Sequence, residues 1–308
     1  MFGEMSIFRI ILLVVFLFLG RKVWKSFVKN GELYENIAYK GKNVVIEVLQ
    51  EGDNPTEVII CSSGYNFELD ENNRVQKHDP LMFKPNNPFK DKNVKVLNMY
   101  YTFSATGLED AAKEVAEYIN SSLKSYDVTL IGHSKSGLCF VKATNWIEER
   151  VRIITISAPF DGTILADKEA FSKRLGTIGK FLYNKIFSNH KVDQDIAPNS
   201  KFLNDLEYHH LKKHDYVNIV SEVGLSFNPI DFVLYLLDTL QNINGDGIVS
   251  SHSQELSLEM LGYPNIQYSK QMQDSLDKYY VERLHIYASH ATSMDKGSEL
   301  IKHIYFKK

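Results

Sequence analysis

The sequence predicts an α/β protein with a mostly parallel sheet that carries helices on both faces. Short apolar runs with strand character alternate with segments of helical spacing, in the order strand, helix, strand, helix, strand. Parallel strands need long crossover connections, and helices in those crossovers cover the sheet. The chain has 308 residues, 44% of them apolar, and can therefore bury one main core of this kind with a substantial insertion.

Apolar runs bounded by glycine, proline or polar turn residues mark the expected strands. They lie at residues 42–49, 58–63, 94–101, 128–131, 153–156, 217–220 and 283–288. Residues 107–123 place apolar side chains at helical spacing, with Glu and Lys on the opposite side, and predict an amphipathic helix. A second helix is expected from Lys135 to Ile147.

A helix-prone segment that includes FSKRLGTIGKFLYNKIF interrupts this alternation. We expect residues 166–206 to form a lid-like insertion over the sheet. On a helical plot, the apolar side chains of this segment fall near one another and lysines are available for anionic head groups, as in a cover that opens toward lipid. These residues are Leu175, Ile178, Phe181, Leu182 and Ile186, with Lys173, Lys180 and Lys185 beside them. The alternative is an amphipathic helix packed permanently on the sheet.

The first 30 residues form a hydrophobic segment of a different kind. Residues 7–19 read IFRIILLVVFLFL, which at ~1.5 Å per residue is short for a hydrocarbon core of ~30 Å. No small-x-small cleavage pattern follows, so we expect a membrane anchor or uncleaved signal at residues 1–30, with a buried core helix as the alternative. Lys and Arg at positions 21, 22, 25 and 29 favour a cytoplasmic side for residues 31–308, whereas an export route would place that domain outside.

Charge, cysteine and histidine content argue against several classes of protein. The 35 basic and 38 acidic residues give a net charge of -3, so no global field attracts nucleic acid. Cys61 and Cys139 have neither disulfide nor zinc spacing and are expected to be buried thiols. The segment with His209, His210 and His214 offers no clear third metal ligand, and we interpret it as a solvated face. We expect neither a metal nor a cofactor.

The motif GHSKSG at residues 132–137 lies between an expected strand and an expected helix. A serine hydroxyl is a weak nucleophile near neutral pH and needs a base, an acid behind that base, and donors for the developing oxyanion. The pattern G-x-S-x-G exposes such a serine in a tight turn that requires small residues on both sides. Gly132 satisfies it, and Ser136 stands in the second glycine position. Ser134 is therefore the candidate nucleophile, with a helix N-cap as the alternative role.

Asp246 and His290 are the candidates for the acid and the base. In this arrangement the chain order is serine, acid, histidine. Asp246 lies in the glycine-flanked segment GDGIV, which could also be an ordinary turn; a calcium loop of the EF-hand kind fails because Ser253 replaces its bidentate glutamate. His290 follows the last expected strand in the loop ASHATSM, whereas His285 falls within that strand and His303 within an expected terminal helix.

Lys135 and Tyr65 are the expected oxyanion donors. The backbone N–H directly after the nucleophile supplies the first, and the loop after the strand at 58–63 supplies the second. Gly64 permits close approach of that loop to the serine, although the loop could also be only a turn.

Taken together, GHSKSG, the SSGY loop, ISAPFDGT, DIAPNSKFLNDL, GDGIVSSHS and SHATSM resemble the α/β-hydrolase superfamily, specifically its bacterial lipase-like members. The resemblance spans residues 58–303 and does not include the anchor. Residues that match such lipases are Pro159, Gly162, Thr163, Pro198, Ser200, Phe202 and Leu203. Ser63 replaces the oxyanion-loop histidine, and Ser136 replaces the elbow glycine.

The resemblance implies the α/β-hydrolase fold and a serine hydrolase that cleaves carboxylic esters, most directly acyl lipids. Ser134, His290 and Asp246 would form the triad and pass through an acyl-enzyme. A thioesterase or acyltransferase would use the same residues. From another class, a catalytically silent scaffold that binds a lipid or a partner at the membrane is the competing hypothesis.

Overall fold

The computed structural model describes the following parts of the chain: residues 36–64, 88–102, 104–163, 191–223, 248–254 and 281–288, together with 166–167, 169, 235, 238–239, 245–246, 293, 296–297 and 300–301. The expected anchor and most of the expected lid lie outside these residues. Within the described parts, no helix has the length and hydropathy that crossing a bilayer requires.

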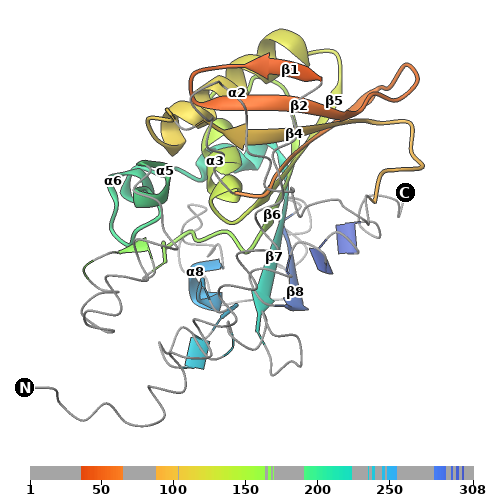
Figure 1. The fold of residues 1–308 in the computed structure, drawn as a ribbon. Coiled ribbons are helices and arrows are strands. Elements are labelled where there is room, and N and C mark those ends of the chain that lie inside the picture. The colour runs from red at the N-terminus through yellow and green to blue at the C-terminus, as the bar shows by residue number, and fades with distance from the viewer. Residues whose placement is uncertain are drawn as a thin grey trace, which may run out of the picture.

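An eight-stranded sheet runs through the described residues in the order β1-β2-β4-β3-β5-β6-β7-β8 (Figure 1). β2 pairs antiparallel with β1 and β4, and the remaining neighbours are parallel. The strands are β1 (Ile37–Lys40), β2 (Val44–Gln50), β3 (Glu57–Ser62), β4 (Lys95–Tyr101), β5 (Asp127–His133), β6 (Arg152–Ile156), β7 (Asp215–Glu222) and β8 (Val281–Tyr287). Every strand expected from the sequence is present; β1 was not predicted because it is short and carries no buried residue.

The described helices are mostly short, apart from the one predicted over residues 107–123. They are α2 (Leu108–Ser122), α3 (Lys135–Ala143), α5 (Lys191–Gln194), α6 (Lys201–Asn204), the 3-10 helix η2 (His209–Lys213) and α8 (Ser251–Gln254). α3 ends at Ala143 and not at Ile147. A turn follows at residues 144–146, in which the hydroxyl of Thr144 donates to the carbonyl of Val141 at 2.7 Å.

Side chains alternate between two apolar layers, one on each face of the sheet. Ile60 and Leu130 pack with α2 and α3 on one face, while Ile59 and Ile131 belong to the second cluster, which includes Ile301 from a helical part of the C-terminal segment. Because β3 and β5 are covered on both sides, their sequences are almost continuously apolar. The prediction of a mostly parallel sheet with helices is confirmed.

Both cysteines are buried and neither forms a disulfide, as the sequence predicts. Cys61 lies in β3 and Cys139 in α3, on opposite faces of the sheet. Burial raises the pKa of the Cys139 thiol to about 12 and that of Cys61 well above its ordinary value. Both are therefore neutral thiols and unsuited to act as nucleophiles.

The antiparallel edge of the sheet is held to α2 by one carboxylate. Glu114 accepts hydrogen bonds from the backbone N–H groups of Lys42, Asn43 and Val44 at 3.0–3.1 Å, and from the Asn43 amide at 2.7 Å. These donors belong to the turn that leads into β2, so the carboxylate fixes β1 and β2 against the helical layer.

Candidate functional site

Ser134 occupies the turn between β5 and α3 in a strained backbone conformation. Its φ is 53° and its ψ is -132°, a region that costs a residue with a side chain about 1–3 kcal/mol. The Ser134 N–H donates to the carbonyl of Ile156 at 2.9 Å, and its own carbonyl accepts from Gly137 N–H at 3.0 Å. Although Ser134 precedes α3, its side chain makes no capping hydrogen bond. This geometry favours the nucleophile interpretation over the N-cap.

Close backbone packing explains the glycines around Ser134. A Cβ at Gly132 would lie 2.6 Å from the amide nitrogen of Gly137, and a Cβ at Gly137 would lie 2.7 Å from the Cβ of Ala158. The second glycine is therefore required at position 137. Ser136 is buried, and its hydroxyl contacts those of Ser62 at 2.7 Å and Tyr101 at 3.1 Å. Ser136, which replaces the second glycine of the motif, thus joins α3 to β3 and β4.

The loop after β3 passes directly beside the elbow. Gly64 has a φ of 79°, and a Cβ built on it would lie 2.7 Å from the carbonyl oxygen of His133 and 3.5 Å from the backbone nitrogen of Lys135. Only a glycine permits this approach. The expected oxyanion donor at Lys135 therefore borders the loop that leads to Tyr65, and Tyr65 itself lies outside the described residues.

The buried imidazole of His133 contacts two segments that are distant in the sequence. Its Nδ1 lies 3.0 Å from the carbonyl oxygen of Ser63, and its Nε2 lies 3.0 Å from the hydroxyl of Ser293. Only 1% of the residue is exposed. No role of His133 was predicted from the sequence, although it is part of the GHSKSG motif.

Asp246 is completely buried after β7 and is surrounded by donors. One carboxylate oxygen accepts from the backbone N–H groups of Ile248 at 3.0 Å and Val249 at 2.8 Å. The other accepts from the hydroxyl of Ser221 at 3.0 Å. A carboxylate held in this way keeps a fixed orientation, which an acid behind a catalytic base requires.

Ser221 and Ser157 connect Asp246 to the elbow. The Ser157 hydroxyl lies 2.5 Å from that of Ser221, which in turn donates to Asp246. Ser157 follows Ile156, the residue whose carbonyl accepts the Ser134 N–H, and it too has a positive φ, of 52°. Two strained serines therefore lie at neighbouring strand ends. No signal in the sequence distinguished Ser157 or Ser221 from ordinary loop and strand residues.

His290 lies outside the described residues, but the chain on either side of it is described. Ala288 donates its N–H to the carbonyl of Glu222 at the end of β7. Ser293 contacts His133, the residue next to Ser134. His285 lies in β8, as predicted. Ala288 therefore lies at the end of β7, and Ser293 lies beside the elbow.

The segment that follows the expected lid packs tightly on the elbow and on α2. The Lys135 ammonium, whose side chain is 6% exposed, pairs with Asp193 of α5 and lies 5.4 Å from the ring centre of Tyr101. Asp195 accepts from Leu108 N–H at 2.8 Å at the start of α2. Residues 191–206, the last part of the expected lid, thus belong to the packed body, and Val192, Phe202 and Leu206 of this part are buried.

Three of the segments with lipase-like sequence contact one another. A Cβ at Gly162 would lie 2.8 Å from the carbonyl oxygen of Ile196, and the Thr163 hydroxyl donates to the carbonyl of Ile248. Ser253 donates to the carbonyl of Gly162 at 2.6 Å. Described residues of the segments 156–163, 195–206 and 245–254 are therefore joined by direct contacts.

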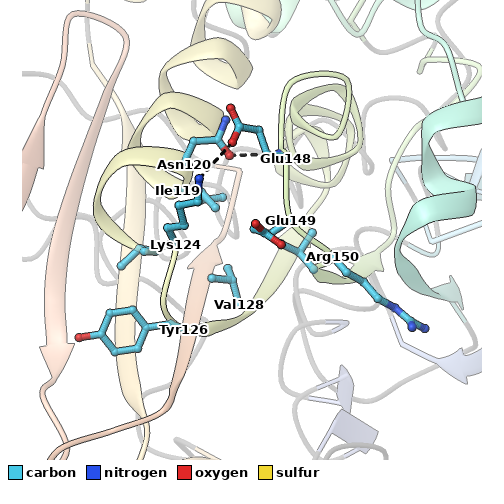
Figure 2. Close-up of a pocket in the computed structure, with 10 residues that line it drawn as sticks. Ile119, Asn120, Lys124, Tyr126, Val128, Glu148, Glu149 and Arg150 are labelled. Atoms are coloured by element: carbon cyan, nitrogen blue, oxygen red, sulfur yellow. Dashed lines mark hydrogen bonds and ion pairs between the residues drawn. The ribbon is translucent and has the colours of Figure 1, made fainter.

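Two further features lie away from the elbow. A pocket lined by residues that include Ile119, Lys124 and Val128 opens at the amino ends of β5 and β6, and Figure 2 shows charged and aliphatic side chains around it. The side chains of Glu207, His209 and His210 bring potential metal-ligand atoms within 4.8 Å of one another, but the first two are exposed. Neither set of residues includes Ser134 or Asp246. His209 is exposed and His210 partly exposed, but the interpretation of a solvated face is wrong for His214, which is buried and accepts from the N–H of Val151 at 3.2 Å.

The sheet order and the strained turn after β5 define an α/β-hydrolase fold. No protein-family model matches the sequence, and no curated protein matches it. Similar solved structures include Bacillus licheniformis lipase BlEst2 in mature form, with a TM-score of 0.55 and 12% identity over 87% of this chain and 98% of that chain. The propeptide form of BlEst2 gives the same TM-score and identity over 86% and 54%. The Pyrococcus furiosus esterase Pf2001 has a TM-score of 0.49 at 12% identity, over 90% and 89%. At such identities the likeness shows the fold alone.

Proposed function

We propose that this protein is a serine hydrolase that cleaves carboxylic esters, with Ser134 as nucleophile, His290 as base and Asp246 as the orienting acid. The observation that carries the proposal is the strained backbone of Ser134, with the Gly64 loop and the Lys135 N–H beside it. Backbone strain at a turn between a strand and a helix is typical of an exposed nucleophile. A serine that only began a helix would need no such conformation.

In the proposed reaction, His290 removes the proton from Ser134 as the oxygen attacks the ester carbonyl. The N–H groups of Lys135 and Tyr65 bind the resulting oxyanion, and Asp246 stabilises the imidazolium. His290 then protonates the leaving alkoxide, which departs as the alcohol. Water, deprotonated by His290, attacks the acyl-enzyme and releases the carboxylic acid, so that the serine is restored.

A fluorophosphonate probe tests the proposed nucleophile directly. The activated Ser134 oxygen should displace fluoride and form a covalent phosphonyl adduct, detectable by mass spectrometry. Ser134→Ala should not be labelled, while Ser136→Ala, which alters the neighbouring buried serine, should be labelled if it folds. Failure of the folded wild-type protein to react would favour the catalytically silent scaffold.

The substrates we propose are acyl lipids. The segment 1–30 would hold the enzyme at a membrane, and a lid within residues 166–190 would cover the acyl site. The apolar run at 7–19, together with the apolar face and the lysines of the lid segment, supports this proposal. A cover that opens toward lipid should raise activity when the substrate passes from dispersed monomers to an interface.

The lid proposal is tested by comparing a short soluble ester with an aggregated long-chain ester. The proteins would be a shortened chain that starts at Glu32 and the same chain with Phe181→Ser and Leu182→Ser. We expect the double variant to lose hydrolytic activity selectively on the aggregated ester, because the apolar face of its lid no longer contacts lipid. Equal loss on both esters would leave a general esterase without an acyl-site lid.

A further inference from the structure

His133 stands between the proposed nucleophile and two segments of the proposed catalytic machinery. Its ring is 1% exposed, and both ring nitrogens have partners at 3.0 Å. One partner is the carbonyl of Ser63, which immediately precedes the loop residue Gly64. The other is the hydroxyl of Ser293, three residues beyond His290 in the chain.

The hydrogen-bonding chemistry of these partners fixes the tautomer of the imidazole. A carbonyl oxygen can only accept, so Nδ1 must carry a proton and donate it to Ser63. In the neutral ring, Nε2 then accepts from the Ser293 hydroxyl. One buried side chain of the elbow thereby joins the oxyanion loop to the C-terminal segment. Ser63 lies 70 residues away from it in the sequence, and Ser293 lies 160 residues away.

We propose that His133 is a positioning residue that tethers the oxyanion loop and the segment carrying His290 to the nucleophile elbow. The inference rests on the proposed function and adds to it a residue that does not itself touch the substrate. Catalysis requires the base to lie within hydrogen-bonding reach of the serine, and small displacements of a catalytic group lower the rate strongly. A tether one residue from Ser134 restricts such displacements from both sides.

Two substitutions of His133 separate the two hydrogen bonds. In His133→Asn, the shorter amide can still donate to the Ser63 carbonyl but does not reach Ser293. In His133→Gln, the longer amide oxygen can accept from Ser293, while the donor to Ser63 is lost. Ser293→Ala removes the second bond alone, and Ser293→Thr retains the hydroxyl.

Turnover of a soluble ester and the rate of fluorophosphonate labelling would be measured for each folded variant. We expect Ser293→Ala and His133→Asn to lower kcat by about tenfold with little change in KM, as the loss of one neutral hydrogen bond would. Ser293→Thr should restore most of the rate. Combining Ser293→Ala with His133→Asn should add no further loss, because both remove the same bond.

The pH dependence of kcat/KM distinguishes a positioning role of the His133 tether from a role in stability alone. If the segment with His290 moves away from Asp246, the imidazolium loses its stabilising carboxylate and its pKa falls. The acidic limb of the kcat/KM profile should then shift to lower pH in Ser293→Ala. The matched control is His214→Asn, because His214 is also buried and bonded to a backbone group, at the opposite end of the sheet. That control should leave the profile unchanged.

Amide hydrogen exchange reads out the tether without requiring turnover. Exchange in the segment 288–301 should increase in Ser293→Ala and His133→Asn and remain unchanged in His214→Asn. If the wild-type protein does not react with the fluorophosphonate but the variants show the expected exchange, the proposed function is overturned and the tether remains. Unchanged exchange together with unchanged labelling in folded Ser293→Ala would overturn the tether and leave the hydrolase proposal intact.

Discussion

The two ends of the parallel strands differ in what their residues do. At the carboxyl ends, Ser134 and Ser157 adopt strained backbone conformations and buried polar side chains contact one another across strands. At the amino ends, charged side chains are largely exposed, as in the ion pair between Lys124 and Glu148 (Figure 2). Both ends belong to the same sheet, so strand formation alone does not explain the difference.

Polar groups that are buried or partly buried at the amino end stabilise the fold itself. His214 accepts from the N–H of Val151, and the amide of Asn120 donates to the Trp146 carbonyl. At the carboxyl end, by contrast, Asp246 and His133 hold segments around a partly exposed serine. In open α/β sheets ligands bind beyond the carboxyl ends of the strands, and the contrast between the two ends follows that rule.

The largest effects should come from breaking the triad at the carboxyl end. His290→Ala should lower kcat by about 10⁶-fold and Asp246→Asn by about 10⁴-fold, with a double variant no worse than His290→Ala alone. Steady-state hydrolysis of a soluble ester measures both. The control is His285→Ala in β8. An inactive His285→Ala beside an active His290→Ala would mean that the strand histidine is the base.

A steric change at the same end should destabilise the fold. Gly132→Ala would place its Cβ 2.6 Å from the Gly137 backbone nitrogen, and neither backbone can yield without opening the elbow. We expect a loss of about 3 kcal/mol or more in the free energy of unfolding, the size typical of overpacking with backbone strain. Urea denaturation measures it. Wild-type stability in Gly132→Ala would show that the elbow is not tightly packed.

The sequence predicted α2 and every described strand except β1, because their apolar spacing is local. It also placed Ser134 between a strand and a helix, where the structure has it, and Asp246 in a turn after a later strand; in the structure Asp246 accepts from Ser221 near the end of β7. It could not predict the contact between His133 and Ser293, because no local pattern relates residues so far apart in the chain. The need for a glycine at position 137 likewise could not be predicted, since it depends on the close approach of Ala158 in the folded chain.

The amino end should show an effect of pH on stability. Burial, with the nearby charge of Lys213, lowers the pKa of His214 from 6.5 to about 4. Because the folded-state pKa lies below the unfolded one, the stabilisation is complete above pH 6.5 and is lost as the pH falls toward 4, by about 2–3 kcal/mol.

Thermal unfolding of wild type and His214→Asn between these pH values measures the loss. The asparagine keeps an acceptor for the Val151 N–H but does not titrate, so its stability should fall less over the same interval. Parallel curves for the two proteins would exclude His214 as the source.

The smallest effect should be a gain in stability at the carboxyl end. Glycine adopts the Ser134 conformation without the clash that a Cβ causes, although it also increases the entropy of the unfolded chain. Relief of about 1–3 kcal/mol of strain against a cost of about 0.5–1 kcal/mol leaves Ser134→Gly more stable by about 1 kcal/mol. Its unfolding midpoint should rise by about 2 °C, measured by calorimetry, while fluorophosphonate labelling disappears. Ser134→Ala, which keeps the Cβ, should show no such gain. A midpoint lowered by Ser134→Gly would mean that the serine side chain stabilises the turn, and that the strain at this end of the sheet has been overestimated.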